Sequence, residues 1–177
     1  LGFVGGEPKS NKSIALLDLC AAVASGQPFL DHAIPTPGPV LLFAAEDPLR
    51  SVASRLRRIC RARGIDAASL DVHIINENLL RLDDATQRQR LRDAVLALRP
   101  RMIALDPFRR LLCGDENDSG LMSALLGELR ALGREAKCSI VIVHHFRKRA
   151  MGDAGGRTAE RLRGSGDIFA AGDCYWL

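Results

Sequence analysis

Residues 6–13, GEPKSNKS, are the stretch of this sequence with the clearest chemical potential. They match the phosphate-binding pattern G-x-x-x-x-G-K-[ST] except that Asn11 stands at the second glycine. In that pattern backbone N–H groups cradle the phosphates, the lysine reaches the terminal phosphate oxygens, and the hydroxyl holds Mg²⁺. Lys12 and Ser13 supply the last two groups. The stretch therefore predicts a site for a nucleoside triphosphate.

Asn11 is the one departure from the pattern. Asparagine is the non-glycine residue that most readily takes a positive φ angle, so it can keep the shape of such a loop. Its side chain would crowd the phosphates slightly, which leaves both tighter and looser nucleotide binding open. An apolar run precedes Gly6, and a helical pattern begins at Ile14, whose dipole favours an anion. The predicted nucleotide-binding residues are Gly6, Glu7, Pro8, Lys9, Ser10, Asn11, Lys12, Ser13 and Ile14.

Two acids follow apolar runs further along the chain, Glu46 after VLLFAA and Asp106 after MIAL. Ligands of open parallel sheets lie at the carboxyl ends of the strands. Hydrolysis of a nucleotide needs one carboxylate for the Mg²⁺ shell and another to orient the attacking water. We expect Asp106, with Ser13, to serve the metal and Glu46 to serve the water. Asp47 is expected to cap the helix that begins at Pro48.

His144 and His145 end the run SIVIVHH, the most strand-like segment of the sequence. A histidine at this end of a strand can donate a hydrogen bond to the terminal phosphate and respond to its loss. Because side chains alternate between the two faces of a strand, only one of the pair can point to the site. His32 and His73 have no such context and are expected to be surface or packing residues.

The segments that must position these groups alternate between apolar runs and amphipathic runs. Buried strands separated by helices favour an α/β fold with a mostly parallel sheet. The expected strands are 1–5, 40–46, 72–76, 102–106, 139–145 and one starting at 174. The expected helices are 14–25, 48–63, 85–99 and 119–136, with Gly26 and Gly64 ending the first two and Asp118 or Ser119 capping the last.

The bulk composition is that of one domain of ordinary size, 177 residues long, which looks like part of a longer protein. Its net charge of +4 and pI of about 9.0 are compatible with a nucleic-acid partner without requiring one. The five cysteines are odd in number and lack CxxC spacing, so we expect reduced, buried thiols in a cytoplasmic protein. No apolar run approaches the roughly 20 residues of a membrane span.

Taken in order, the motifs resemble the RecA-like ATPase core of hexameric replicative helicases. The series comprises the phosphate loop, LLFAAEDP, MIALDPFRRLLCGDENDS, IVIVHHFRK and LRGSGDIFAAGD. It is most similar to plasmid RepA-type helicases and RepA-like ATPases, and the resemblance spans the whole chain. No single motif decides it, but the ordered series is specific.

The resemblance implies a RecA-like P-loop fold, a three-layer αβα sandwich, with ATP and Mg²⁺ as cofactors. Lys12 and Ser13 would bind the nucleotide, Glu46 would be the catalytic acid, Asp106 the Walker B acid, and His144 or His145 the γ-phosphate sensor. Residues 147–166 would face the channel of a homo-oligomeric ring, a hexamer, and contact single-stranded DNA. The predicted DNA-binding residues are Arg147, Lys148, Arg149, Arg157, Arg161 and Arg163.

These basic residues lie in a glycine-rich stretch, which is typical of a flexible grip on a phosphate backbone and also of an ordinary solvated loop. The resemblance also implies an arginine that completes each site from a neighbouring subunit; it is unassigned, and Arg163 is a candidate. The leading hypothesis is an ATP-hydrolysing motor of a DNA helicase or replication factor. The alternatives are a nucleotide-dependent regulatory or loading module with little turnover, and a RecA-type recombinase.

Overall fold

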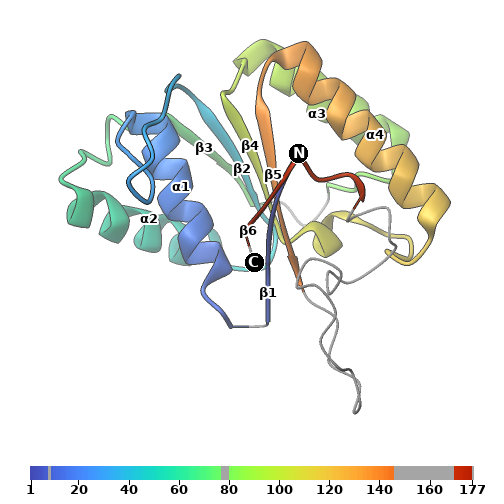
Figure 1. Ribbon diagram of the computed structural model, residues 1–177, viewed down its shortest axis with the longest axis horizontal. Helices are drawn as coiled ribbons and strands as arrows, with labels where there is room; N and C mark the ends of the chain where they lie inside the picture. The colour runs from blue at the N-terminus through green and yellow to red at the C-terminus, as the bar shows by residue number, and fades with distance from the viewer. Residues whose placement is uncertain (8, 77–79, 146–169, 177) are drawn as a thin grey trace.

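The structure, a computed structural model, describes residues 1–7, 9–76, 80–145 and 170–176. Its centre is a six-stranded sheet with the order β3-β2-β4-β5-β1-β6 (Figure 1). Every strand pairing in the described part is parallel, which confirms the predicted α/β class. The strands are β1 (Gly2–Gly6), β2 (Val40–Ala44), β3 (Val72–Ile75), β4 (Met102–Asp106), β5 (Ser139–His145) and β6 (Cys174–Trp176).

Helices cover both faces of the sheet and make the three-layer αβα sandwich that was predicted. In Figure 1, α1 and α2 lie on one side of the strands, and α3 and α4 lie on the other. A short 3₁₀ helix, η1, follows β4 and was not expected from the sequence. The helices are α1 (Lys12–Ser25), α2 (Leu49–Arg63), α3 (Ala85–Leu98), η1 (Phe108–Leu111) and α4 (Ser119–Ala136).

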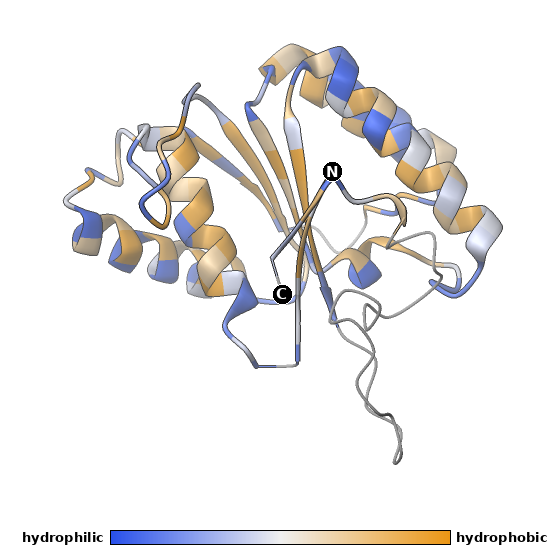
Figure 2. Ribbon diagram, in the orientation of Figure 1, coloured by the Kyte–Doolittle hydropathy of each residue, from blue (hydrophilic) through white to orange (hydrophobic). Residues whose placement is uncertain are grey.

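The central strands are buried on both faces, which explains why their sequences are continuous apolar runs. All five residues of β2 are buried. Its alternate residues belong to two separate hydrophobic cores. Leu41 and Phe43 pack on the α3 and α4 side, while Leu42 and Ala44 pack on the α1 and α2 side. Figure 2 shows the strands as mainly hydrophobic and the helices as mixed. The carboxyl edge of this sheet carries the predicted site.

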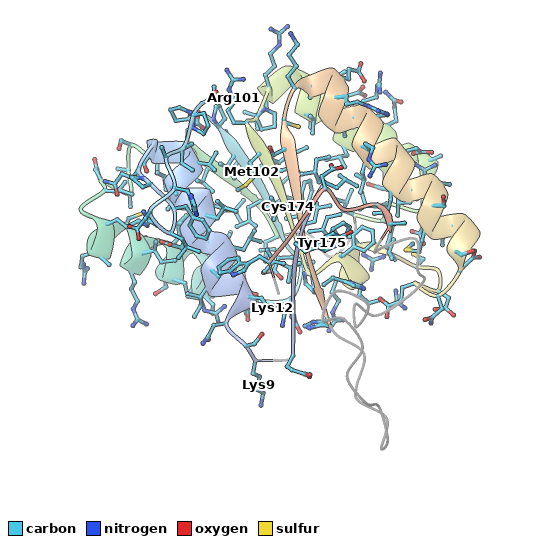
Figure 3. The ribbon with its side chains drawn as sticks, in the orientation of Figure 1. Lys9, Lys12, Arg101, Met102, Cys174 and Tyr175 are labelled. Atoms are coloured by element: carbon cyan, nitrogen blue, oxygen red, sulfur yellow. The ribbon has the colours of Figure 1, made fainter. Side chains whose placement is uncertain are left out.

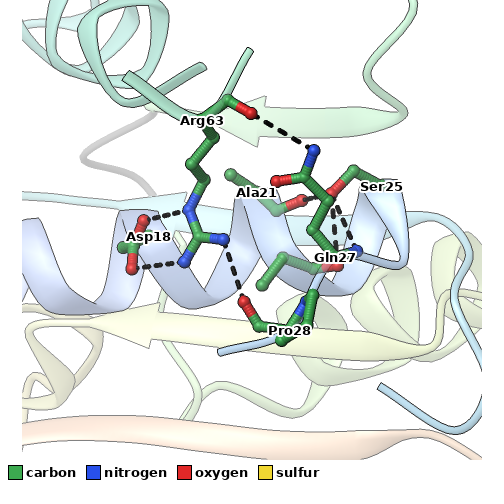
Figure 4. Close-up of polar contacts among 7 residues, drawn as sticks. Asp18, Ala21, Ser25, Gln27, Pro28 and Arg63 are labelled. Atoms are coloured by element: carbon green, nitrogen blue, oxygen red, sulfur yellow. Dashed lines mark hydrogen bonds and ion pairs between the residues drawn. The ribbon is translucent and has the colours of Figure 1, made fainter. Parts of the chain in front are cut away.

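A salt bridge fixes α1 to α2 and to the connection that follows α1 (Figure 4). The Arg63 guanidinium donates to both carboxylate oxygens of Asp18, at 2.5 and 2.6 Å. Its third contact is the Pro28 carbonyl at 2.9 Å, and the Gln27 amide donates back to the Arg63 carbonyl at 3.3 Å. Bidentate arginine–carboxylate pairs have a defined geometry, so this contact helps to orient the helix that begins at the phosphate-binding loop.

The ends of the helices confirm most of the expected caps. Gly26 and Gly64 take the left-handed conformation at the ends of α1 and α2. The Asp118 carboxylate caps α4 by accepting from the Leu121 N–H at 3.0 Å.

The prediction for Asp47 was wrong. The N-cap of α2 is Pro48, with no side-chain cap hydrogen bond, so Asp47 lies one residue too early to reach the first amides. Its carboxylate is paired instead with Arg55, two turns along α2.

The cysteines follow the prediction only in part. All five are free thiols; Cys20 and Cys60 are buried, whereas Cys113 and Cys174 are exposed, so the expectation of burial was wrong for the latter two. Cys113 lies in the loop after η1 and Cys174 in the edge strand β6, where few neighbouring residues can cover a side chain. His73 is a surface residue, as expected, and contacts Asp71 at 2.8 Å. Among the described residues, no helix has the length and apolar character that crossing a membrane requires.

Candidate active site

The phosphate-binding loop joins the carboxyl end of β1 to the first turn of α1, as predicted. Asn11 has φ 62° and ψ 19°, the left-handed conformation, and serves as the N-cap residue of α1. This confirms that asparagine occupies a position whose backbone favours glycine or asparagine. The loop thus keeps its backbone path without the second glycine. Pro8 lies outside the described residues, and Ile14 is exposed on the first turn of α1.

Gly6 lies close against the side chains of Ser10 and Lys12. A Cβ atom placed on it would lie 2.7 Å from the Ser10 hydroxyl and 3.4 Å from Cδ of Lys12. A contact under 3.0 Å requires an atom to move, so a larger residue at Gly6 would require the Ser10 side chain to shift. The first glycine of the pattern is therefore explained by close packing.

Lys12 is buried, with 8% of its surface exposed, and its ammonium group lies inside the loop. The ammonium donates to the carbonyls of Gly6 at 3.1 Å and Glu7 at 2.6 Å, and to the Ser10 hydroxyl at 3.2 Å. Burial lowers the pKa of Lys12, while the charges of Asp106, Glu7 and Glu46 act in the opposite direction. Figure 3 shows Lys12 at the carboxyl edge of the sheet, beside the start of α1.

Asp106 is the last residue of β4 and faces the first turn of α1. The Ser13 hydroxyl donates a hydrogen bond to its carboxylate. Burial, followed by the nearby charges of Glu46 and Asp47, raises the pKa of Asp106 to about 6, although the Ser13 bond and Lys12 oppose the shift. The hydroxyl and the carboxylate predicted to serve the same metal are thus direct neighbours.

Glu46 lies in the turn after β2, and not on the strand as predicted. Strand β2 ends at Ala44, which pairs in register with Asp106, and the Ala45 N–H donates to the Asp106 carbonyl at 2.8 Å. The Glu46 side chain is exposed. A cavity at this edge is lined by Glu46, Asp47, Arg55, Ser13 and Asp106, together with apolar residues of α1, β2 and α2. The structure therefore brings the predicted acids together beside the loop.

The two histidines lie on opposite faces of the sheet, as alternation requires. His144 is 1% exposed and packs edge-on against Phe108 of η1, with ring centroids 6.2 Å apart. His145 falls on the other face, which α1 covers, and pairs in register with Gly6 at the start of the loop. Of the two predicted sensors, His145 therefore has the backbone position nearer to the phosphate-binding loop.

Two residues of this region were not singled out from the sequence. Arg55 of α2 lines the cavity and pairs with Asp47, and Asn76 contacts the turn that carries Glu46. Asn76 is the last residue of the predicted strand 72–76, so the strand-end rule that selected the acids could also have selected it. The predicted DNA-binding residues, which are Arg147, Lys148, Arg149, Arg157, Arg161 and Arg163, lie outside the described residues.

Comparison with known proteins identifies the class. The sequence model of the AAA domain family matches residues 1–151, and the chain belongs to this family. The solved structure of another protein's ATPase domain superposes with a TM-score of 0.67 over 98% of this chain and 67% of that chain. At 14% sequence identity this likeness concerns the fold, and it confirms the RecA-like arrangement. The chain is therefore an ATPase-type, nucleotide-binding domain of the AAA family with a RecA-like αβα fold.

Proposed function

We propose that this domain is the ATP-hydrolysing motor of a DNA helicase or related replication factor that acts on single-stranded DNA. The observation that carries the proposal is the meeting of an ammonium, a hydroxyl and two acids at one edge of the sheet. Lys12 interacts electrostatically with both Asp106 and Glu46, and Ser13 donates to Asp106. This set of groups, on a strand–loop–helix unit, is the one that phosphoryl transfer from a nucleotide requires.

Nucleotide binding falls to the loop and to Lys12. The loop N–H groups at the start of α1 attract the phosphate charges. The Lys12 ammonium already lies among loop carbonyls, so on binding it exchanges those contacts for charge-assisted hydrogen bonds to phosphate oxygens.

The donors present fit Mg²⁺. This ion prefers hard oxygen ligands and commonly takes one or two carboxylates plus substrate phosphates. Ser13 and Asp106 supply a hydroxyl and a carboxylate in direct contact. Among the described residues no group of three acidic, cysteine or histidine side chains is placed to hold a metal by itself. When bound, the metal would neutralise charge on the phosphates.

Glu46 is the proposed catalytic acid. Its carboxylate is exposed at the mouth of the site, where it can accept a hydrogen bond from the attacking water. His145 is the proposed γ-phosphate sensor because it lies beside Gly6 and on the α1 face.

The proposal also includes single-stranded DNA as the partner and a ring as the assembly. The net charge of +4 and the basic residues of 147–163 suit a phosphate backbone. The resemblance to RepA-type helicases supports a hexameric ring in which each site is completed by an arginine of the next subunit. We also infer that residues 1–177 form a single domain within a longer protein.

The test is the steady-state ATPase rate with and without single-stranded DNA, combined with strand displacement on a forked duplex. A motor hydrolyses ATP faster with DNA, and changing Arg147, Lys148 and Arg149 to alanine removes the stimulation but keeps the basal rate. Tight nucleotide binding without turnover would instead identify a regulatory module. Filaments on DNA in electron micrographs would identify a recombinase.

A further inference from the structure

Asn76 holds the turn that carries Glu46. It is the first residue after β3, and its side-chain amide donates to the Asp47 carbonyl at 2.7 Å and also to the Ala44 carbonyl. These two carbonyls stand on either side of residues 45 and 46. One side chain thus bridges both ends of the segment that presents the proposed catalytic acid.

The position of this contact follows from the sheet register. The pairing of β2 with β3 ends at Phe43 and Ile75. The next residues along the chain are Ala44 and Asn76. Beyond that point the backbones of β2 and β3 no longer pair, and the Asn76 side chain donates to the Ala44 carbonyl instead. An amide nitrogen has two N–H donors, so it can serve two carbonyls at once.

Two further contacts hold the same turn from other elements. The Ala45 N–H donates to the Asp106 carbonyl of β4 at 2.8 Å, and the Asp47 carboxylate pairs with Arg55 of α2. The backbone around Glu46 is therefore tied to β3, β4 and α2, whereas the Glu46 side chain is exposed. Of these three ties, the one from Asn76 spans Glu46 on both sides.

We propose that Asn76 is a positioning residue for catalysis, which fixes the Glu46 backbone so that its carboxylate faces the attacking water. This inference rests on the proposed function of Glu46. In the described part of the chain, the Asn76 amide donates to the turn after β2 and not to the loop around Lys12, so its effect should fall on turnover and not on nucleotide binding. Displacements of about 1 Å at such a group can lower a rate about 100-fold.

Two variants of Asn76 test whether it positions Glu46 or only contributes to the stability of the fold. Asn76→Ala removes the amide, and Asn76→Asp keeps the shape while placing an acceptor against two carbonyl acceptors. His73→Ala is the matched control, because His73 lies on β3, just before Asn76, and its exposed side chain pairs with the exposed Asp71. Amide hydrogen exchange of the peptide covering residues 44–48 measures the hold on the turn. Steady-state kinetics, alone and combined with Glu46→Gln, measure its catalytic effect.

Both Asn76 variants should exchange that peptide about fivefold faster or more, as the loss of one or more ordinary hydrogen bonds implies. They should lower kcat about 10- to 100-fold with KM within about twofold, and they should cause no further loss in the Glu46→Gln background. An equal loss in both backgrounds, a change confined to KM, or unaltered exchange would overturn the inference. If the wild type shows no turnover, the proposed function fails, while the exchange data still decide whether Asn76 holds the turn.

Discussion

Replacement of Asp106 by asparagine should make the protein more stable and less active. The folded state raises the pKa of this carboxyl from 3.8 to about 6, chiefly by burial. That difference, at 1.36 kcal/mol per pH unit, means that the ionised form costs the folded state about 3 kcal/mol at neutral pH. Asparagine carries no charge and can still accept the Ser13 hydrogen bond. After relaxation we expect a gain of about 1–3 kcal/mol in the free energy of unfolding.

The sign of the pH dependence follows from the direction of the shift. Below pH 3.8 the carboxyl is protonated in both states, so wild type and variant should differ little through this charge. Between about pH 4 and 6 the unfolded chain loses its proton first, because the folded pKa is raised. The wild type therefore loses stability relative to the variant across this window, and the gap stays constant above it.

The assay is urea unfolding of both proteins at pH 4.0, 5.0, 6.0 and 7.5, with the ATPase rate of each measured at the last pH. For a chain of this size the gain corresponds to a rise in Tm of about 2–4 °C per kcal/mol. Turnover should fall at least about 100-fold, since a metal-site acid is lost. A variant less stable than wild type at pH 7.5, or a difference that is the same at all four pH values, would refute the reasoning.

Substitutions at three further positions test separate parts of the structure. Lys12→Ala should weaken ATP binding about 10- to 100-fold in calorimetry, the value of one strong charge-assisted hydrogen bond, and unchanged affinity would remove Lys12 from the site. Asn11→Gly should change the unfolding free energy by less than about 1 kcal/mol, whereas Asn11→Val should lower it by about 1–2 kcal/mol because φ at this position is 62°. Equal effects of the two variants in urea unfolding would contradict the claim that the left-handed backbone selects the residue type. Arg63→Ala should lower stability by about 1–2 kcal/mol through loss of the contacts to Asp18 and Pro28, measured by the urea midpoint, and no shift would show that the pair is energetically neutral.

The sequence predicted the parts of this fold that depend on local pattern. Strands β4 and β5 and helix α4 have the predicted bounds, because continuous apolar runs and a capping aspartate mark them clearly. The positive φ of Asn11 agrees with the expectation that asparagine could keep the shape of the loop, since few non-glycine residue types accept that conformation. The strand order and the all-parallel pairing were not predicted in detail, because register depends on contacts between distant segments.

The site was predictable in its chemical groups but not in its geometry. The strand-end rule found Glu46 and Asp106, yet β2 ends at Ala44 because its ladder with β4 stops there. The choice between His144 and His145 needed the register of β5 with β1. Asp47 was misassigned as a cap because its partner, Arg55, lies eight residues away.

The most direct test of the account is phosphate release from ATP by the wild type and by Glu46→Gln, each at a saturating concentration of nucleotide. Calorimetry on the same samples shows whether binding is kept. We predict that the variant binds ATP with an affinity within about threefold of wild type but hydrolyses it at least about 100-fold more slowly. Equal rates in the two proteins would contradict the claim that the acids at this edge of the sheet form an ATPase site around Glu46.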